Sequence, residues 1–424
     1  MKVEERALEV QSVSLVDQSF RSVLFKKLET ITEGRLEVVE KFNGMNSVYQ
    51  FGKTGGPAHL HARITISRPR AYGRIALGGT VGGGESYMDG DWDCDHLTPL
   101  IRIFARNHQL HTGLDKGWGA LTVPLKKLFH LMRNNSLSGA KDNIHAHYDI
   151  GNDFFELFLD SSYLYSSGIF KNEETTLEEA QFEKMDRICK KLELKPEDSL
   201  LEIGTGWGGF AIHAAKYYGC KVTTTTISEK QFLLAKERIA HEGLSGQVQV
   251  LSKDYRLLEG AYDKLVSIEM IEAVGLNHLE EYFAKCSALL KPSGQMLLQA
   301  ITIRDQQFQS AKKNVDFVQR YIFPGSGIPS IESMSRALAA KTDFQLSHLE
   351  DFGYHYARTL SEWSKRLHAN HSKLLQRNYS ERLYRMWQYY FGYCEGGFHE
   401  RNIGVVQMLL LKPNSTRSPL IAKI

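Results

Sequence analysis

The sequence has no long apolar run. Within its 424 residues, no stretch approaches the roughly 20 apolar residues that a membrane-spanning helix needs. Its first residues, Met1 to Val10, are acidic, whereas a secretory signal peptide starts with basic residues and continues with an apolar core. We therefore expect the protein to be made and kept in the cytoplasm.

Paired cysteines and a strong charge of one sign are also lacking. The five cysteines are scattered without a Cys-x-x-Cys pair, which is typical of reduced thiols rather than of a disulfide framework or a zinc site. The net charge of +3 is too small to favour nucleic-acid binding. With 42% hydrophobic and 24% charged residues, the chain has the composition of an ordinary globular protein that forms a packed core.

Three stretches of the chain differ in texture. Residues 1–110 combine short β-like runs with glycine clusters such as 77–84, and we expect a small α+β domain there. Residues 111–145 form a predicted linker that contains a basic, apolar segment over 121–133. Residues 146–424 alternate strand and helix patterns, which indicates an α/β domain with a parallel sheet.

A glycine-rich loop follows the first predicted strand of the α/β domain, residues 199–203. Gly204, Gly206 and Gly208 let the backbone pass close to a ligand at the carboxyl end of that strand. A dinucleotide site would use Gly209 as its third glycine and an acid at the end of the second strand, but hydroxyl residues stand there instead. Dinucleotide binding and a tight turn without a ligand remain the alternatives.

Further motifs stand in a fixed order around this loop. They are His147-Tyr-Asp-Ile-Gly-Asn-Asp-Phe-Phe, Tyr165-Ser166, Thr226-Ile-Ser-Glu-Lys-Gln231, Asp254-Tyr255-Arg256, Tyr321-Ile-Phe-Pro-Gly, Tyr379-Ser-Glu-Arg and the stretch from Tyr390 to Cys394. In these motifs the chain resembles the cyclopropane-fatty-acyl-phospholipid synthases and their relatives, the mycolic acid cyclopropane synthases and methyltransferases. The resemblance implies a class I (Rossmann-like) methyltransferase fold, with a mostly parallel seven-stranded sheet and a smaller N-terminal α+β domain that interacts with lipid.

The resemblance also implies S-adenosylmethionine as the cofactor. A sulfonium cofactor carries little negative charge, so the loop needs no lysine, unlike a phosphate site. For Trp207 and Tyr255, a place in the aromatic core is the alternative. The residues implied to bind the cofactor are Tyr165, Ser166, Glu202, Gly204, Thr205, Gly206, Trp207, Gly208, Thr226, Ser228, Gln231, Asp254 and Tyr255.

Methylation of an alkene needs no deprotonated nucleophile, because the π bond itself attacks the methyl group. It builds positive charge on the acyl chain, and one proton must then leave. The resemblance implies bicarbonate as the candidate proton acceptor, held with the help of Glu272 and Tyr356. Cys394 matches the cysteine usually marked as an active-site residue, but a thiol has no clear role in this chemistry, so we interpret it as part of the wall of the site.

The chain departs from the family pattern near the proposed base. Ser167 replaces a cysteine, Gln299 replaces a histidine after the fifth strand, and Glu269 stands where a small residue is usual. Gln299 can donate a hydrogen bond to an anion but cannot carry a proton. If Glu269 is buried beside Glu272, we expect it to take over part of the proton handling; a solvated acid at the strand end is the alternative.

The resemblance implies that the enzyme acts on cis double bonds of unsaturated acyl chains in membrane phospholipids. The product would be a cyclopropane or a methylated or methylene chain. Lys126, Lys127 and Arg133 beside an apolar stripe predict peripheral docking on the anionic inner face of the membrane, with a buried interdomain helix as the alternative. A homodimer is a candidate assembly, and no nucleic-acid partner is expected. The rival functions are a small-molecule N- or O-methyltransferase and a non-catalytic lipid-binding protein.

Overall fold

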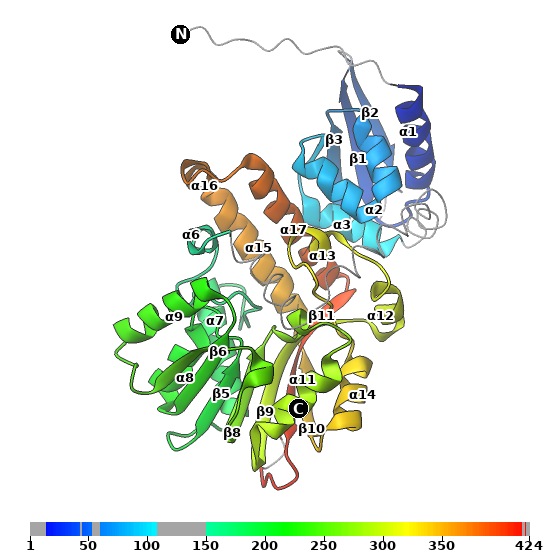
Figure 1. Ribbon diagram of the computed structural model, residues 1–424. Coiled ribbons are helices and arrows are strands. Elements are labelled where there is room, and N and C mark those ends of the chain that lie inside the picture. Colours follow the sequence, from blue (N-terminus) through cyan, green and yellow to red (C-terminus); the bar gives the residue numbers. More distant parts are fainter. Residues whose placement is uncertain (1–13, 43–44, 53–59, 108–149, 418–419, 421–424) are drawn as a thin grey trace. The chain divides into compact units, whose positions relative to one another are not determined.

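The computed structural model describes residues 14–42, 45–52, 60–107, 150–417 and 420 (Figure 1). The predicted linker over 111–145, with its basic segment, and the start of the motif at His147 lie outside the described residues. The chain divides into two compact units, residues 1–126 with 379–400 and residues 127–378 with 401–424. In the described part of the chain, no helix has both the length and the apolar character that crossing a bilayer requires.

The larger unit is built on a seven-stranded sheet. Its order is β10-β11-β9-β8-β5-β6-β7, and β11 alone runs antiparallel to its neighbours. The predicted α/β fold with a mostly parallel seven-stranded sheet is therefore confirmed. The strands are β5 (Ser199–Ile203), β6 (Lys221–Thr226), β7 (Val248–Ser252), β8 (Tyr262–Ile268), β9 (Leu290–Ile303), β10 (Gln345–Asp351) and β11 (Ile403–Leu411).

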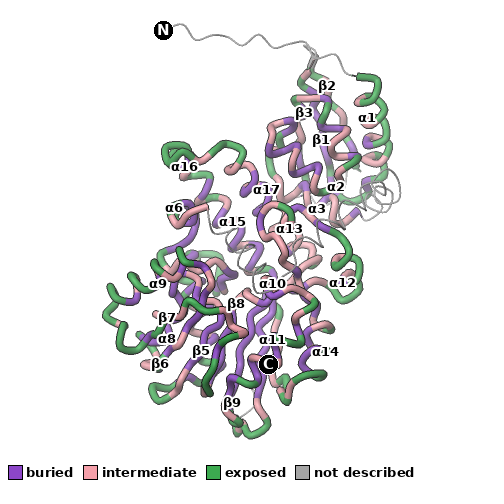
Figure 2. Tube along the Cα trace, viewed as in Figure 1, coloured by how far each residue is buried: buried purple, intermediate pink, exposed green. Residues whose placement is uncertain are grey.

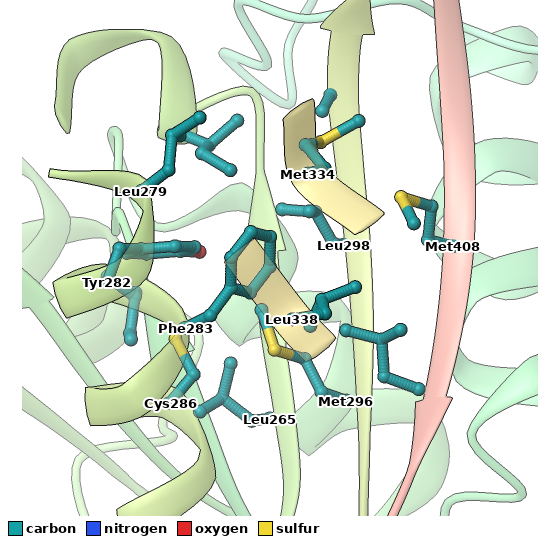
Figure 3. Packing of buried hydrophobic residues seen from close by; sticks show 14 of the residues in the cluster. Leu265, Leu279, Tyr282, Phe283, Cys286, Met296, Leu298, Met334, Leu338 and Met408 are labelled. Carbon is teal, nitrogen blue, oxygen red and sulfur yellow. The ribbon is translucent and has the colours of Figure 1, made fainter. Parts of the chain in front are cut away.

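Helices cover both faces of this sheet. Because neighbouring side chains of a strand point to opposite faces, Leu200 packs in one core cluster and Leu201 in the other. Figure 3 shows the second cluster, in which side chains of α11 and α14 meet those of β8, β9 and β11. The helices are α6 (Asn152–Phe155), α7 (Leu177–Lys191), α8 (Gly209–Tyr218), α9 (Glu229–His241), α10 (Ile271–Val274), α11 (Leu279–Ala288), α12 (Asp305–Ala311), α13 (Phe317–Tyr321), α14 (Ile331–Lys341), α15 (Gly353–Ala369) and α16 (His371–Gln376), with a 3-10 turn at Tyr255–Leu257.

Helix α7 presents a polar pair to the buried side of the sheet. A capping box at its start, in which Thr176 and Glu179 exchange side-chain and backbone hydrogen bonds, fixes where the helix begins. Most of its buried residues are apolar, but Lys184 and Lys191 are buried as well. The strands that this helix packs near, such as β5, are mainly buried too (Figure 2). Buried lysines are rare unless they are paired, so both indicate acceptors nearby.

The smaller unit contains a four-stranded sheet in the order β2-β1-β3-β4. Its hydrogen-bonded register pairs β1 with β2 antiparallel, β1 with β3 parallel and β3 with β4 antiparallel. The elements are α1 (Leu15–Leu28), β1 (Arg35–Phe42), β2 (Met45–Phe51), β3 (His61–Ile66), α2 (Arg70–Met88), β4 (Trp92–Cys94), α3 (Leu97–Arg106) and α17 (Glu381–His399).

Two features of the smaller unit differ from expectation. The glycine cluster over 77–84 lies inside α2, where Gly79 has a left-handed φ of 54° and kinks the helix. Helix α17 groups with α2 and α3, although the sequence suggested a catalytic domain that runs unbroken from 146 to 424. Glycine permits this packing, because a Cβ on Gly396 would stand only 2.7 Å from Ile101 Cγ2. The domain boundaries themselves remain a prediction.

Candidate functional site

The glycine loop turns sharply at the carboxyl end of β5. The amide nitrogens of Gly204 and Thr205 donate to the carbonyl of Thr225, at 3.1 and 3.0 Å, which ties the loop to β6. Gly204, Gly206 and Gly208 have φ values of 103°, 52° and 86°, a region that side chains with a Cβ rarely adopt. A Cβ on Gly206 would meet no protein atom within 4 Å, so the loop leaves open space on that side.

A buried carboxyl supports the loop from below. Thr224 Oγ1 donates to Glu202 Oε2 at 2.6 Å and also lies 2.7 Å from Thr205 Oγ1, so a chain of hydroxyl groups joins the strand to the loop. Burial raises the pKa of Glu202 to about 8, while the Thr224 bond and the Lys184 charge oppose the rise. We predicted that Glu202 binds the cofactor. In the structure its carboxyl accepts a hydrogen bond from Thr224 of β6.

A clamp made of backbone and side-chain atoms holds the glycine loop from the other side. Trp207 is buried, and its Nε1 donates to Asn152 Oδ1 at 2.8 Å. Arg238 of α9 donates to the carbonyl oxygens of Trp207, Ser162 and Ser161, at 2.6, 3.1 and 2.9 Å. No motif in the sequence indicated Arg238, which there is one basic residue among several in the same segment.

The ends of β6 and β7 carry the remaining predicted cofactor residues. Thr226 Oγ1 donates to Gln231 Oε1 at 2.9 Å and accepts from the backbone of Ser228 at 3.1 Å, so the three form one cap at the start of α9. Asp254 accepts two side-chain bonds from Arg256, and the charge of that arginine keeps its carboxyl pKa low despite burial. Because β6 pairs parallel with β5 and β7 pairs parallel with β6, the carboxyl ends of all three strands lie at the edge that holds the glycine loop.

Two further predicted cofactor residues are aromatic. Tyr255 packs edge-on against Tyr282, with the ring centroids 5.5 Å apart. Tyr165 lies among aromatic rings, 5.1 Å from Trp363 and stacked on Phe323 at 6.0 Å. Such rings exclude water and present π faces, which attract a cation.

Ser166 is held by helix α7. Lys184 Nζ donates to Ser166 Oγ at 2.6 Å, and Gln181 Nε2 donates to the Ser166 carbonyl at 2.8 Å. Burial lowers the pKa of Lys184 to about 8, and the charges of Glu269, Asp160 and Glu202 oppose that fall. Lys184 is therefore a buried cation between carboxylates. No motif in the sequence indicated this residue.

Glu269 is the centre of the predicted catalytic group. Its carboxylate accepts three hydrogen bonds: from the backbone of Ser167 at 2.9 Å, from Gln299 Nε2 at 2.8 Å and from the Tyr356 hydroxyl at 2.6 Å. Burial raises the pKa of Glu269, and these bonds together with the Lys184 charge make the rise smaller. The backbone of Glu269 has a left-handed φ of 50°, a strained conformation for a residue with a Cβ. Because three protein donors bind the Glu269 carboxylate, the alternative of a solvated acid at the strand end does not fit the structure.

Glu272 lies beside Glu269 with fewer partners. Its Oε1 accepts a bond from the backbone nitrogen of Ile301 at 2.5 Å, whereas its Oε2 is buried and has no hydrogen-bond partner. Burial, followed by the charge of Glu269, raises the pKa of Glu272 to about 8. Of the two neighbouring carboxyls, Glu269 is the one stabilised as an anion and Glu272 the one that keeps its proton near neutral pH.

The structure does not place every predicted residue in this group. Four of these residues belong to the larger unit: Glu269 and Glu272 follow β8, and Tyr356 lies on α15. Gln299 was expected after the fifth strand but lies within β9, because this strand continues to Ile303. Cys394 lies on α17, in the smaller unit, so its catalytic role remains a prediction. None of the five cysteines forms a disulfide.

Comparison with known proteins gives the chain a family. Residues 135–408 match the family described as mycolic acid cyclopropane synthetase. The cyclopropane-fatty-acyl-phospholipid synthase of Escherichia coli is 36% identical over 82% of this chain and 87% of that protein. The tuberculostearic acid methyltransferase UfaA1 of Mycobacterium tuberculosis is 33% identical over 86% of this chain and 87% of that protein.

Solved structures agree with this result and bear on the cofactor. The cyclopropane synthase MmaA2 of Mycobacterium tuberculosis is 33% identical, with a TM-score of 0.60 over 64% of this chain and 98% of that one. The mycolic acid cyclopropane synthase CmaA1, solved in complex with SAH and CTAB, is 30% identical with the same TM-score and coverage.

The glycine loop fits the cofactor that these relatives use. The open side of Gly206 leaves room that a side chain would fill, and the loop carries no lysine of the kind a phosphate site needs. The cofactor is S-adenosylmethionine, and at the level of the family the reaction is methylation or cyclopropanation of lipid acyl chains. The chain belongs to the mycolic acid cyclopropane synthetase family and is an S-adenosylmethionine-dependent methyltransferase.

Proposed function

We propose that this enzyme methylates cis double bonds in the acyl chains of membrane phospholipids, and that Glu269 is the base that removes the proton afterwards. The observation that carries the proposal is the set of three donors on Glu269. The family resemblance assigns Tyr356 to a bicarbonate ion, and Ser167 and Gln299 replace family residues near the expected base. All three bind the Glu269 carboxylate. A carboxylate of the chain thus takes the position expected for the ion.

The chain contributes to each stage of this reaction. S-adenosylmethionine, when bound at the glycine loop, supplies an electrophilic methyl group. The π electrons of the double bond form the new carbon–carbon bond, which leaves a positive charge on the neighbouring acyl carbon. The aromatic rings around Tyr165 exclude water from that cation and stabilise its charge. Glu269 then accepts a proton from a carbon next to the cation, and the electron pair of that C–H bond forms a new double bond.

Glu269 suits this role better than Glu272. A base must be anionic before the proton arrives, and three hydrogen bonds together with the Lys184 charge favour the anion of Glu269. Glu272 has the pKa raised to about 8 and one buried oxygen without a partner, which favours its protonated form. Glu272 therefore serves as a neutral neighbour that does not compete for the proton near pH 7.

We propose a methyl-branched alkene, formed by proton loss from a chain carbon, as the product rather than a cyclopropane or a methylene chain. Ring closure requires the proton to leave from the transferred methyl group. The Glu269 carboxylate is fixed by its own backbone and by three donors, so it cannot shift toward that methyl group as a separate ion can. Overall similarity does not choose between products, because the relatives named for methylation and for cyclopropane synthesis match at 33% and 36% identity.

Mass spectrometry of lipids from a host that lacks cyclopropane synthase tests this function. Cells that express the chain and receive methyl-deuterated methionine should accumulate phospholipid acyl chains that carry deuterium and are cleaved by ozone, because they keep a double bond. Retention of the complete deuterated methyl group shows that the proton left a chain carbon. Loss of one deuterium from a chain that ozone still cleaves would show a methylene product and would contradict this route. An ozone-resistant ring as the sole product would contradict the proposed product, and unlabelled lipid would contradict the lipid substrate.

A variant at Glu269 serves as the matched control. Glu269→Gln keeps the size and one acceptor oxygen but cannot take a proton. We expect product formation to fall by about 100-fold or more, the usual contribution of a positioned base, while calorimetry shows unchanged binding of S-adenosylmethionine. Equal turnover by this variant would assign the proton transfer to another group.

We also propose that the substrate is reached by peripheral docking on an anionic membrane. The support is the basic, apolar segment over 121–133, which lies outside the described residues. Lys126→Glu with Lys127→Glu should weaken binding to anionic vesicles by about 1 kcal/mol per residue, with a loss that salt abolishes. Equal vesicle binding by the double variant would favour another docking surface. The cytoplasmic location and the homodimer remain predictions.

A further inference from the structure

A row of polar side chains crosses the sheet of the larger unit. Gln299 of β9 pairs directly with Gln407 of β11, and Gln407 pairs directly with Glu350 of β10. On the other side, Gln299 is in register with Ile268, the residue before Glu269. Directly opposite residues of neighbouring strands project to the same face, so the row leads from an edge strand to Glu269.

Hydrogen bonds connect the members of this row without a gap. Gln299 donates to Glu269 at 2.8 Å and accepts from Gln407 Nε2 at 3.0 Å. Gln407 Oε1 in turn accepts from Lys191 Nζ at 2.7 Å, and Lys191 also donates to Glu350. Both glutamines are fully buried, so no water competes for their amide groups.

The chemistry of the two ends fixes the direction of every bond. The ammonium group of Lys191 has donors only, so Gln407 must turn its oxygen toward it and its NH₂ toward Gln299. Gln299 must then accept with its oxygen, which leaves its NH₂ for the acceptor-only carboxylate of Glu269. Reversal of either amide would set donor against donor and oxygen against oxygen inside the core. The donor-only ammonium group at one end and the acceptor-only carboxylate at the other thus fix the orientation of both amides.

We propose that Lys191 and Gln407 are positioning residues, which act through Gln299 to keep Glu269 supplied with a donor and therefore anionic. The inference rests on the proposed role of Glu269 as the base. In the hydrogen bonds of the row, both residues reach Glu269 through Gln299. Their function is to prevent the amide of Gln299 from reversing and presenting its oxygen to the carboxylate.

Other charged groups face the two ends of the row and remain in place when it is cut. Glu269 is faced by Lys184 from α7, by Glu272 from α10 and by the hydroxyl of Tyr356 from α15. Lys191 is faced by Glu350 and by the positive charges of Arg187 and Arg417. Because Arg187 also binds Glu350 at 2.9 Å, Glu350 keeps a partner when Lys191 is replaced.

Cutting the row should change how Glu269 titrates. In Gln407→Leu and Lys191→Met, we expect the pKa of Glu269 to rise, because its anion loses a fixed donor. The acid limb of the pH–rate profile should move upward by about one unit, and the rate near the old limb should fall by about tenfold. Gln407→Glu should have a larger effect, since an acceptor-only group at this position turns the NH₂ of Gln299 away from Glu269.

Two variants serve as controls for this test. Lys191→Arg keeps a donor-only cation at the end of the row and should retain the wild-type profile. Lys412→Met removes another largely buried lysine that pairs with an acid, Asp343, away from the row. Its profile should not shift, even if its stability falls.

An infrared pH titration provides a readout that does not depend on activity. The protonated-carboxyl band that disappears in Glu269→Gln identifies Glu269, and its midpoint should move upward in Gln407→Leu and in Lys191→Met. If both variants fold, as circular dichroism shows, but neither the midpoint nor the acid limb moves, the inference is wrong. If wild-type enzyme makes no methylated acyl chain, the proposed function fails, and the infrared titration still decides the positioning role.

Discussion

The hydroxyl group of Tyr356 lies 2.6 Å from Oε2 of Glu269, where it joins helix α15 to the end of strand β8. Family resemblance assigns Tyr356 to a bicarbonate ion. In this protein its hydroxyl binds the carboxylate of Glu269 instead. Glu269 has a left-handed backbone to reach this position. Such strain is usually retained where the surrounding contacts over-determine the conformation.

Removal of the Glu269 side chain should restore a dependence on bicarbonate. In Glu269→Gly combined with Gln299→His, the three donors lose their internal acceptor, and glycine tolerates the left-handed φ of 50°. We expect cyclopropane to appear among the products and its yield to rise with added bicarbonate. Lipid mass spectrometry at controlled bicarbonate concentration measures both effects.

Gln299→His alone is the control for this experiment. It leaves the Glu269 carboxylate in place, so we expect no gain of bicarbonate dependence. A bicarbonate effect of the same size in wild type and in both variants would refute the replacement of the ion by Glu269.

Gly206→Val should weaken binding of S-adenosylmethionine without unfolding the protein. The new side chain would project into the open space at the loop, and a steric cost of roughly 1–3 kcal/mol lowers affinity by about 5- to 150-fold. Gly243→Val is a matched control, because Gly243 also has a left-handed φ, of 71°, and open space beyond its Cβ. Calorimetry should show lower affinity in the first variant and normal affinity in the second; equal affinities would place the cofactor elsewhere.

Arg238→Met should raise the KM for S-adenosylmethionine more than it lowers kcat. Arg238 donates to three backbone carbonyls that hold the glycine loop, and methionine keeps the length of the side chain without any donor. We expect a rise of about tenfold, since a hydrogen bond from a charged group contributes roughly 1.5–3 kcal/mol. Steady-state kinetics measure the change, with the exposed Arg336→Met as control. A fall in kcat alone would assign Arg238 a different role.

Glu202→Gln should change how stability depends on pH. Burial raises the pKa of Glu202 from 4.5 to about 8, so the folded protein binds a proton that the unfolded chain releases between these values. Wild type therefore loses stability as pH rises from 4.5 to 8, and the loss is on the order of a few kcal/mol as an upper bound. The variant, which carries no charge at this position, should gain relative to wild type over that window.

Urea unfolding at several pH values measures the Glu202 effect. Glu350→Gln should change the pH dependence of stability in the opposite direction. Bonds from Arg187 and Lys191 outweigh burial and lower the pKa of Glu350 to about 2. Its contribution is present above pH 4.5 and is lost as pH falls toward 2, so this variant should be less stable than wild type near neutral pH. If the free energy of unfolding differs between wild type and Glu202→Gln by the same amount at every pH, the Glu202 carboxyl is not the buried group that titrates.

Local patterns in the sequence were sufficient to predict the sheet and the glycine loop. The strand over 199–203 was predicted with the bounds that the structure has, because a run of apolar residues acts over neighbouring positions. The glycine cluster over 77–84 was not predicted to lie in a helix, because glycine breaks helices and strands alike and only packing decides between them.

The sequence by itself determined the order of elements, the cofactor loop and the presence of an unusual acid at 269, since these depend on residues close together in the chain. The tertiary structure decided what that acid does. The donors Ser167 and Tyr356 stand 102 and 87 residues from Glu269, and Lys191 stands 216 residues from Gln407. Burial, and with it the pKa of each carboxyl, depends on which of these distant groups the sheet brings together, and a local pattern does not encode that.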